Sequence, residues 1–280
     1  MKKFKSFFKT VDSRKFNTWC KWTNRLDTYG CGCAHDCSYC YAKSLLDFRG
    51  LWDTQSPSVA DLVEIERKIK KLPQGTVVRM GGMTDCFQPI ERTERVTYET
   101  IKLLNKYGIE YLVVTKSHTV ADDEYMEILD RDLAHIQITI TSTDDEFCAT
   151  YEKASPPSLR IQAIEKLQRN GFDVSVRLSP FIPQFVDVNK INSIKCDKIL
   201  IEFLKVNTWV KKWFDIDYSD YSLKFGGYNH LPLDKKIELV NKITGFKEVS
   251  VGEYVKEHYE YFRDNVNHNK NDCCNLRRKS

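Results

Sequence analysis

Residues 31–42 read CGCAHDCSYCYA and contain four cysteines within ten positions. Cys33, Cys37 and Cys40 are spaced C-x3-C-x2-C, and Tyr39 directly precedes the last of them. Three thiolates this close together can hold three corners of a cubane iron–sulfur cluster and leave the fourth iron open to a small molecule. A structural zinc site needs a fourth ligand and usually pairs two short knuckles, so zinc is the weaker alternative. Cys31 is predicted to be a small buried side chain rather than a fourth sulfur near the cluster.

The length and composition of the chain set outer bounds on its class. With 280 residues the chain can bury one large core, and a single α/β barrel is favoured over two domains. The sequence has no run of about 18 apolar residues and no charged leader followed by an apolar stretch, so it predicts neither a membrane span nor a signal peptide. We therefore expect a cytoplasmic protein. Its ten cysteines indicate metal and thiol chemistry in a reducing compartment rather than a disulfide framework.

Positive charge is concentrated at the N-terminus, although the net charge of the whole chain is only +4. Residues 1–25 contain eight lysines and arginines against the single acidic residue Asp12. Aromatic residues such as Trp19 and Trp22 are interleaved with these basic residues. Two interpretations stay open: an electrostatic and stacking surface for a nucleic acid, or a solvated segment whose aromatic rings pack on the barrel.

After the cysteine-rich loop the chain alternates between helical and extended hydrophobic periodicity. The helical pattern covers 60–72, 92–106, 122–130, 157–169 and 233–243. The extended pattern covers 76–80, 111–115, 136–141, 174–178, 198–203 and 248–251, and a first strand is expected before Cys31. This alternation predicts an α/β fold with a parallel sheet of about six to seven strands and right-handed crossovers.

Glycines and polar residues follow two of these strands, at the sheet edge where barrel enzymes carry their chemistry. The pair Gly81-Gly82 allows a ligand to approach the backbone closely, although such a pair is often only a turn. The hydroxyls of Thr141 and Ser142 can hydrogen-bond a ribose. Further on, Glu152 and Arg160 either fix the loop by an ion pair or contact the ligand.

The cysteine spacing and its aromatic residue closely resemble the signature of the radical S-adenosylmethionine (radical SAM) family. Over about residues 25–205 the strand ends resemble the spore photoproduct lyase-like subgroup, through Thr84-Asp85, Thr115-Lys116, the segment from Glu152 to Arg160, and Pro180-Phe181-Ile182-Pro183. The chain departs from the subgroup at Lys153, where proline is usual, and at Thr141, where serine is usual. Neither change need disable cofactor binding, but both count against the lesion-repair reaction itself.

The resemblance implies an α/β fold with a partial (β/α)6 TIM-like barrel of parallel strands. It implies a [4Fe-4S] cluster held by Cys33, Cys37 and Cys40, whose open iron chelates the amino and carboxylate groups of S-adenosylmethionine. In the family the reduced cluster cleaves S-adenosylmethionine to a 5′-deoxyadenosyl radical, which abstracts a hydrogen atom from the substrate. An external electron donor such as flavodoxin or ferredoxin is expected.

The resemblance also implies which residues bind S-adenosylmethionine. In the family a glycine-containing segment contacts the methionine ammonium, and Lys116 would pair with the methionine carboxylate; an exposed surface lysine is the alternative. The complete set expected at the cofactor is Tyr39, Gly81, Gly82, Thr84, Lys116, Thr141, Ser142 and Arg160.

Several cysteines outside the cluster motif are candidate catalytic thiols. In spore photoproduct lyase a thiol after the second strand returns a hydrogen atom to the product radical, and Cys86 lies in the matching region but not at the matching position. Cys148 is its rival, and either is alternatively a buried apolar cysteine. The vicinal Cys273-Cys274 pair supplies further thiols if the tail folds back; the alternative is a disordered or edge-packed tail. Cys20 and Cys196 are expected to be structural.

The sequence thus predicts a basic aromatic segment at 1–24, a radical SAM partial barrel at 25–252, and a C-terminal helix with a Cys-Cys tail at 253–280. The predicted protein is a radical SAM enzyme, a lyase or a modifying enzyme, that acts on a nucleic acid or nucleotide base in the manner of spore photoproduct lyase. One alternative is a radical SAM enzyme with a small-molecule, peptide or RNA substrate. The other is a non-catalytic metal-cluster protein that binds nucleic acid.

Overall fold

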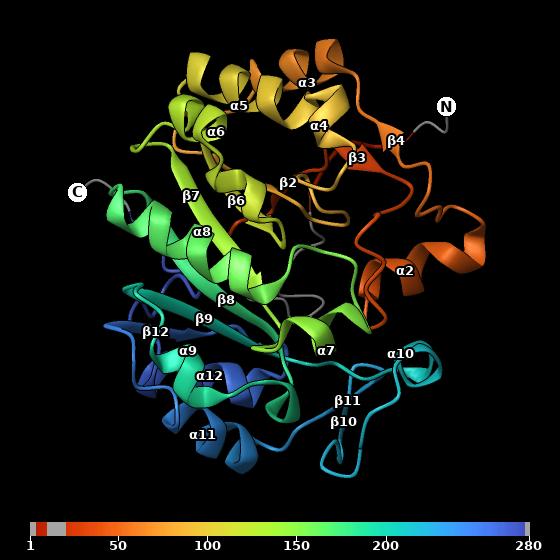
Figure 1. Ribbon diagram of the computed structural model, residues 1–280, viewed down its shortest axis with the longest axis vertical. Coiled ribbons are helices and arrows are strands. Elements are labelled where there is room, and N and C mark those ends of the chain that lie inside the picture. The colour runs from red at the N-terminus through yellow and green to blue at the C-terminus, as the bar shows by residue number, and fades with distance from the viewer. Residues whose placement is uncertain (1–3, 10–20, 278–280) are drawn as a thin grey trace.

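The computed structural model describes residues 4–9 and 21–277 and shows an α/β fold built on an eight-stranded sheet (Figure 1). Its strand order is β1-β2-β5-β6-β7-β8-β9-β12. Strand β1 (Phe7–Lys9) is antiparallel to its neighbour, and the strands that follow it in this order are parallel: β2 (Asn24–Leu26), β5 (Val77–Met80), β6 (Glu110–Thr115), β7 (Ala134–Ile140), β8 (Asp173–Phe181), β9 (Lys198–Phe203) and β12 (Glu248–Val251). In the described residues β1 and β12 are edges, so the sheet is open and the predicted partial barrel is confirmed.

Helices cover the outer face of this sheet, as right-handed crossovers between parallel strands require (Figure 1). Outward-facing strand residues such as Val78 and Ile138 belong to one buried apolar cluster with Ile65, Leu104 and Ile164 from the helices. The principal helices of this layer are α3 (Leu62–Ile69), α5 (Val96–Lys106), α6 (Asp123–Ile128), α8 (Pro157–Arg169), α9 (Val188–Asn192), α11 (Leu233–Asn241) and α12 (Lys256–Asn265).

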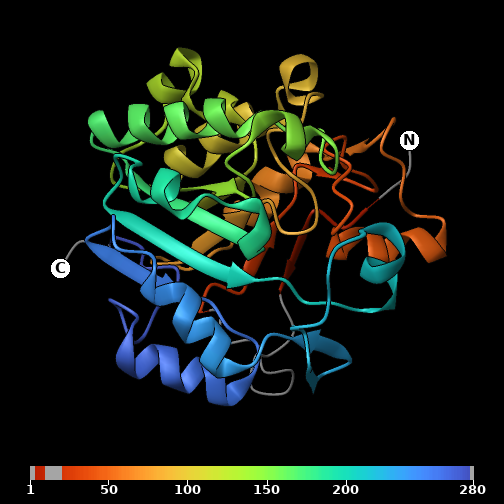
Figure 2. The same cartoon turned by 60° about the horizontal axis from the view of Figure 1, so that its bottom comes forward.

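Shorter elements gather near the end of the sheet toward which the parallel strands run. Helices α2 (Tyr41–Leu46) and α10 (Thr208–Trp213) lie side by side there (Figure 1 and Figure 2). The remaining short elements are β3 (Tyr29–Gly30), β4 (Ser58–Val59), β10 (Leu223–Phe225), β11 (Tyr228–His230), α4 (Glu91–Glu94), α7 (Asp145–Ala149), η1 (Asp47–Arg49), η2 (His118–Ala121) and η3 (Pro183–Phe185).

The predicted helix at 92–106 is wrong in one respect, because the chain forms two helices there. Arg95, with φ of 57°, separates α4 from α5. The cause is the buried carboxylate of Glu91, which accepts hydrogen bonds from the N–H groups of Thr97 (2.8 Å) and Tyr98 (2.9 Å) at the start of α5. This carboxylate caps α5 as an N-cap side chain would, and the tyrosine hydroxyls of Tyr29 and Tyr125 hold it in place.

The C-terminal tail lies against the inner face of the sheet. Alternation along the strands turns Val77, Leu112 and Leu200 to this face, and they form a second apolar cluster with Trp22, Cys274 and Leu276. The buried Asp272 carboxylate accepts a hydrogen bond from Trp22 Nε1 at 3.0 Å. Polar side chains of the strands also bind tail carbonyls: Gln137 donates to Cys274 O (3.4 Å) and Lys198 to Asn275 O (3.0 Å). The tail is therefore an ordered part of the barrel interior.

The N-terminal segment is described only in part. Strand β1 extends the sheet, and the rings of Phe4 and Phe7 pack against the core, as one of the two interpretations expected. Residues 10–20, with Trp19 and Cys20, lie outside the described residues. The division of the chain at 24 and 252 stays a prediction. Among the described helices, none is both long and apolar enough to serve as a membrane span.

Candidate active site

The carboxyl ends of the parallel strands surround a cavity of about 510 Å³. One wall is the cysteine loop, residues 31–40, and the others are the ends of β5, β6, β8, β9 and β12. The residues lining it include Cys33, Cys37 and Cys40, together with Lys116. Residues more than 200 positions apart, such as Cys33 and Cys273, thus meet in one space, as expected at this end of a barrel.

The cysteine loop is held in shape by two tight turns and by its neighbours. Within the loop, Asp36 N donates to Cys33 O (3.2 Å) and Cys40 N to Cys37 O (3.1 Å). Gly32 has a φ of 152°, and a Cβ atom there would lie 1.7 Å from a backbone oxygen of Asp53, so only glycine fits.

Two other strand ends fasten the loop to the sheet. After β5, the Gln88 side chain accepts a hydrogen bond from Ala34 N at 2.9 Å. After β7, Lys153 N donates to His35 O at 2.7 Å, and Tyr151 O accepts from Ser38 N at 2.9 Å. The loop therefore has one backbone conformation fixed by the sheet, which positions its three thiols at the cavity wall.

The three thiols make a donor set that fits a cubane cluster. Burial raises the pKa of the Cys33 thiol to about 12 and also raises the pKa values of Cys37 and Cys40, while the positive charge of Lys116 opposes the shift at the latter two. A cluster binds thiolates, so its binding must displace protons from these sulfurs. Within residues 4–9 and 21–277, no three His, Cys, Asp or Glu side chains converge as ligands of a single metal ion would. The three thiols instead stand round one side of a larger cavity.

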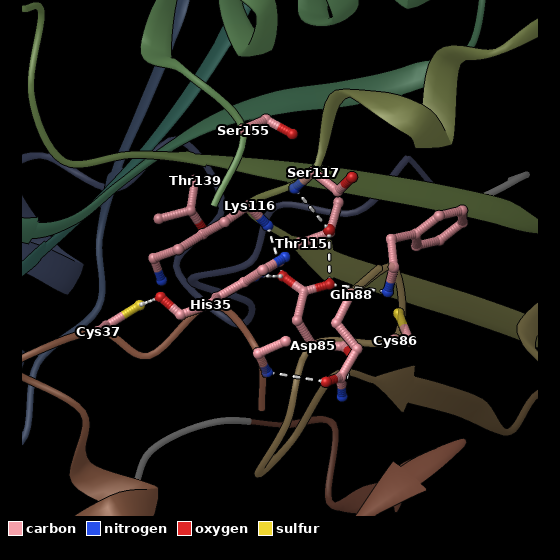
Figure 3. Close-up of polar contacts among 12 residues, drawn as sticks. His35, Cys37, Asp85, Cys86, Gln88, Thr115, Lys116, Ser117, Thr139 and Ser155 are labelled. Carbon is pink, nitrogen blue, oxygen red and sulfur yellow. Dashed lines mark hydrogen bonds and ion pairs between the residues drawn. The ribbon is translucent and has the colours of Figure 1, made fainter. Parts of the chain in front are cut away.

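Asp85 ties the cysteine loop to β6 (Figure 3). Its carboxylate accepts hydrogen bonds from Thr115 Oγ1 and Lys116 N, both at 2.7 Å, and lies 3.3 Å from His35 Nδ1. Burial opposes ionisation, but the His35 charge and these hydrogen bonds outweigh it and hold the pKa of Asp85 at about 2. Thr84, the neighbouring residue that was expected at the cofactor, also lines the cavity, and its hydroxyl donates to Tyr29 O.

Lys116 is a basic residue of the cavity wall beside the cysteine loop. Its side chain extends toward Cys37 in Figure 3, and its Nζ lies 5.5 Å from the centroid of the Tyr39 ring. The buried Glu152 accepts the hydroxyl hydrogen bond of Tyr39, which fixes the ring. An ammonium group held at a cavity wall can pair with the carboxylate of a small ligand.

The Gly81-Gly82 pair forms the turn after β5, where Gly81 lines the cavity with φ of 79°. A Cβ atom on Gly81 would come within 2.3 Å of Val114 O, so a side chain is excluded. The N–H groups of Gly82 (2.7 Å) and Met83 (3.0 Å) donate to Asp27, whose pKa burial raises to about 7 against these hydrogen bonds. The turn is therefore shaped by the buried carboxylate of Asp27, directly after β2, which sequence reasoning did not identify.

Thr141, Ser142 and Arg160 lie behind the cavity rather than on its wall. All three are fully buried, and Arg160 forms an ion pair with the equally buried Glu152. Thr141 Oγ1 donates to the same carboxylate at 3.1 Å. The structure thus brings Thr141 and Arg160 together as a support for Glu152 and Tyr39, whereas the Ser142 hydroxyl bonds the backbone of Asp144. The assignment of all three to cofactor binding stays a prediction.

The remaining cysteines are placed differently from one another. Cys86 is fully buried in the apolar core, and Cys148 donates to Glu152 at 3.1 Å; neither lines the cavity. Figure 3 shows Cys86 on the far side of Asp85 from Cys37. Cys273 is half-buried and does line the cavity, because the tail carries it along the inner face of the sheet.

Comparison with curated proteins finds relatives of unassigned function. An uncharacterized protein of Methanocaldococcus jannaschii is 28% identical over 167 residues, which are 57% of this chain and 61% of that protein. An uncharacterized protein of Acidianus two-tailed virus is 27% identical over 171 residues, which are 55% of each chain. This chain therefore spans little more than half the length of the curated relatives it matches.

Solved structures with the same fold include several radical SAM enzymes. A variant of spore photoproduct lyase superposes with a TM-score of 0.65 at 16% identity, over 88% of this chain and 79% of that one. Streptococcus suis SuiB bound to S-adenosylmethionine superposes with a TM-score of 0.53 at 12% identity, over 82% of this chain and 49% of that one. At such identities the likeness concerns the fold.

The family model described as the radical SAM superfamily matches residues 28–188, which are more than half of the chain and include the cysteine loop and the β5 to β8 strand ends. The chain therefore belongs to the radical SAM superfamily, whose enzymes use a [4Fe-4S] cluster and S-adenosylmethionine, and it has the fold of spore photoproduct lyase.

Proposed function

We propose that this enzyme carries out a radical reaction on a nucleic acid or a nucleotide base, as a lyase or a modifying enzyme. The observation that carries the proposal is the shared cavity, which has the three thiols of the cysteine loop at one side and continues to the basic ends of β8 and β9 at the other. When bound, the cluster supplies the electron that cleaves S-adenosylmethionine, and the adenosyl fragment abstracts a hydrogen atom from the substrate.

Different residues of the chain would bind the cluster and S-adenosylmethionine. Cys33, Cys37 and Cys40 would hold the cluster at the cavity wall. Lys116 would pair with the methionine carboxylate, and Gly81 would let the ligand approach the backbone because no side chain fits there. Buried carboxylates outside the cavity, such as Glu152, keep the surrounding side chains in place.

The electron donor belongs to the proposal as well. An external flavodoxin or ferredoxin would reduce the cluster. Helix α2 begins directly after Cys40 and exposes Tyr41 and Leu45 on its surface, with Phe48 following in η1. We propose this exposed apolar surface, which follows the cysteine loop in the chain, as the contact face for the electron donor.

A radical SAM enzyme with a small-molecule, peptide or RNA substrate remains the second candidate. Spore photoproduct lyase, which has the same fold, has been solved in complex with a dinucleoside spore photoproduct, and this supports the nucleic-acid alternative over the others. The family assignment favours an enzyme over a non-catalytic cluster protein.

The test is anaerobic reconstitution followed by turnover with S-adenosylmethionine and a chemical reductant. 5′-Deoxyadenosine would be measured alone and with undamaged DNA, ultraviolet-irradiated DNA or RNA, and each nucleic acid would be digested and analysed by mass spectrometry. We expect one nucleic acid to raise the deoxyadenosine yield and to change in mass. A yield that no nucleic acid alters, with unchanged masses, contradicts the proposal.

A further inference from the structure

A group of basic side chains lies on the inner face of the sheet, at the side of the cavity away from the cysteine loop. Arg79 of β5, Arg177 of β8 and Lys205 after β9 all line the cavity. All three act on the same carboxylate, that of Glu202 in β9. Burial opposes ionisation of Glu202, but Arg177, Arg79 and Lys205 hold its pKa at about 2. The three cations are therefore gathered around one carboxylate at the cavity wall.

Arg177 is held in place by two side-chain hydrogen bonds. Its guanidinium donates one hydrogen bond to Glu202 and another to Gln137 Oε1 at 2.6 Å, and the side chain is buried. Ser179 Oγ also donates to Glu202, at 2.8 Å. A guanidinium fixed in this way keeps its orientation when a second anion approaches, which favours binding of a planar or tetrahedral oxyanion.

Lys205 is held by aromatic rings. Its Nζ lies 4.3 Å from the centroid of the Tyr254 ring, and Tyr254 stacks on His230 with an interplanar angle of 9°. Burial lowers the pKa of Lys205, whereas Glu202 and the face of the tyrosine ring favour its charged form. The cation therefore has a defined place beside the arginines while its side chain remains accessible to solvent.

Basic side chains outnumber carboxylates on this side of the cavity wall. Among the described lining residues, Arg79, Arg177 and Lys205 all act on Glu202, and Glu253, which pairs with Lys236 at 2.5 Å, also acts on Lys205. The other lining carboxylates, Asp36 and Asp85, pair with Lys153 (2.9 Å) and His35 (3.3 Å) at the cysteine loop. An excess of positive charge at a cavity wall favours the approach of an anionic ligand.

We propose that Arg79, Arg177 and Lys205 form a subsite for a phosphate group of the substrate. Arginine forks bind two phosphate oxygens at once, and a lysine adds a point charge. This inference rests on the proposed function and deepens it, because it names the chemical group by which a nucleotide or nucleic-acid substrate is held opposite the cysteine loop. The shared chemistry is phosphate, either the diester of a nucleic acid or the monoester of a free nucleotide.

The test compares two probes that differ only in charge: a thymidine dinucleotide with its phosphodiester, and the same molecule with a neutral methylphosphonate. Dissociation constants would be measured by calorimetry on the reconstituted full chain. Lys205→Gln should weaken binding of the charged probe about 10-fold, the loss expected for a hydrogen bond to a charged group, and leave the neutral probe unchanged. Higher salt should weaken the parent more than the variant.

The matched control is Lys211→Gln. Lys211 also lies over a tyrosine ring, 5.5 Å from the centroid of Tyr218, but it does not line the cavity. It should bind both probes as the parent does. The affinity for S-adenosylmethionine, measured in parallel, should be the same in both variants and shows that the fold is kept.

The outcomes separate the subsite from the proposed function. Equal affinity of the two probes, or no effect of Lys205→Gln, overturns the subsite. Tight binding of thymidine monophosphate without binding of the dinucleotide supports the phosphate subsite and overturns the nucleic-acid part of the proposed function. A parent that converts nucleic acid but shows no preference for the charged probe supports the function and overturns the subsite.

Discussion

Lys116 is fixed in the cavity by contacts at both ends of the residue. Its N–H donates to Asp85 at 2.7 Å, and its ammonium lies over the ring of Tyr39 beside the thiol of Cys37. The backbone contact does not depend on the side chain. Substitution at this position can therefore remove the charge without displacing the loop that Asp85 organises.

We predict that Lys116→Ala weakens binding of S-adenosylmethionine by about 1.5–3 kcal/mol, the range for losing a hydrogen bond to a charged group, while iron loading stays at the parent level. Equilibrium binding to the reconstituted protein measures the first and iron analysis the second. Lys102→Ala, on the exposed side of α5, serves as the control. An unchanged dissociation constant for Lys116→Ala would mean that this lysine does not contact the cofactor.

The cysteines outside the cluster motif differ in what they can reach. Cys86 is fully buried in the core, so Cys86→Ala should lower the free energy of unfolding by about 1 kcal/mol and leave the product unchanged.

Cys273 lines the cavity, so its weak S–H bond is better placed to donate a hydrogen atom to a product radical. Cys273→Ala should therefore form 5′-deoxyadenosine but give altered product, seen by mass spectrometry. Altered product from Cys86→Ala and normal product from Cys273→Ala would return that role to Cys86.

At the scale of elements, local periodicity predicted the outer layer well. Helix α8 and strands β9 and β12 have the predicted bounds, because each carries a long or undisturbed apolar pattern. The break at Arg95 could not be predicted, since it depends on Glu91 meeting Tyr29 and Tyr125 from other elements. The β10–β11 hairpin was missed although Gly226-Gly227, both with positive φ, is a signal for its turn.

The tail is the element whose place depends most on distant contacts. Trp22 and Asp272 are 250 positions apart, and nothing local in either segment indicates that they meet. Truncation of the tail would expose the inner apolar cluster, so single substitutions are better probes of Cys273 than removal of the segment.

We predict that Trp22→Phe lowers the free energy of unfolding by about 1–3 kcal/mol, because it keeps a smaller aromatic ring but deprives the buried Asp272 carboxylate of one donor. Urea unfolding measures the change. Trp209→Phe on α10, where the side chain is exposed, should unfold as the parent does. Equal stability of Trp22→Phe and the parent would show that this contact does not hold the tail.

At the scale of the whole molecule, charged residues close the end of the sheet opposite the cavity. Asp173 lies 2.5 Å from His135 Nδ1 and 2.8 Å from Lys198 Nζ, and it accepts a hydrogen bond from Arg277 N in the tail at 2.9 Å. Burial would raise its pKa, but His135 and Lys198 lower it from 3.8 to about 2. The Asp173 carboxylate on β8 thus joins its own strand to both neighbouring strands, β7 and β9, and to the tail.

Because the pKa of Asp173 is depressed by folding, its ionised form stabilises the native state above about pH 4, and this contribution is lost as the pH falls toward 2. Asp173→Asn should therefore cost about 2 kcal/mol at pH 7 and less at pH 3. Denaturant unfolding at both pH values measures the difference. Asp123→Asn, which removes an exposed ion pair, should show little effect at either. A cost that is the same at pH 7 and pH 3 would contradict this account.

The candidate site shows the same division between local and distant information. Spacing alone identified Cys33, Cys37 and Cys40 as candidate cluster ligands, because the thiols of one short loop must lie near one another. Thr141 and Arg160 are buried behind the cavity wall, and their predicted contact with the cofactor stays a prediction. Sequence position does not tell which side of a strand end faces the cavity. The polar residues of the inner face, such as Arg177, carry no local motif and were found only through the fold.

The central claim is that the cysteine loop carries the cluster of a radical SAM enzyme. The most direct test measures iron content and 5′-deoxyadenosine formation in anaerobically reconstituted parent, Cys37→Ala and Cys31→Ala chains. The parent and Cys31→Ala, whose side chain does not line the cavity, should bind about four iron atoms and cleave S-adenosylmethionine, whereas Cys37→Ala should lose most iron and all cleavage. Full iron loading of Cys37→Ala, or a parent that binds iron but forms no 5′-deoxyadenosine, would contradict the claim.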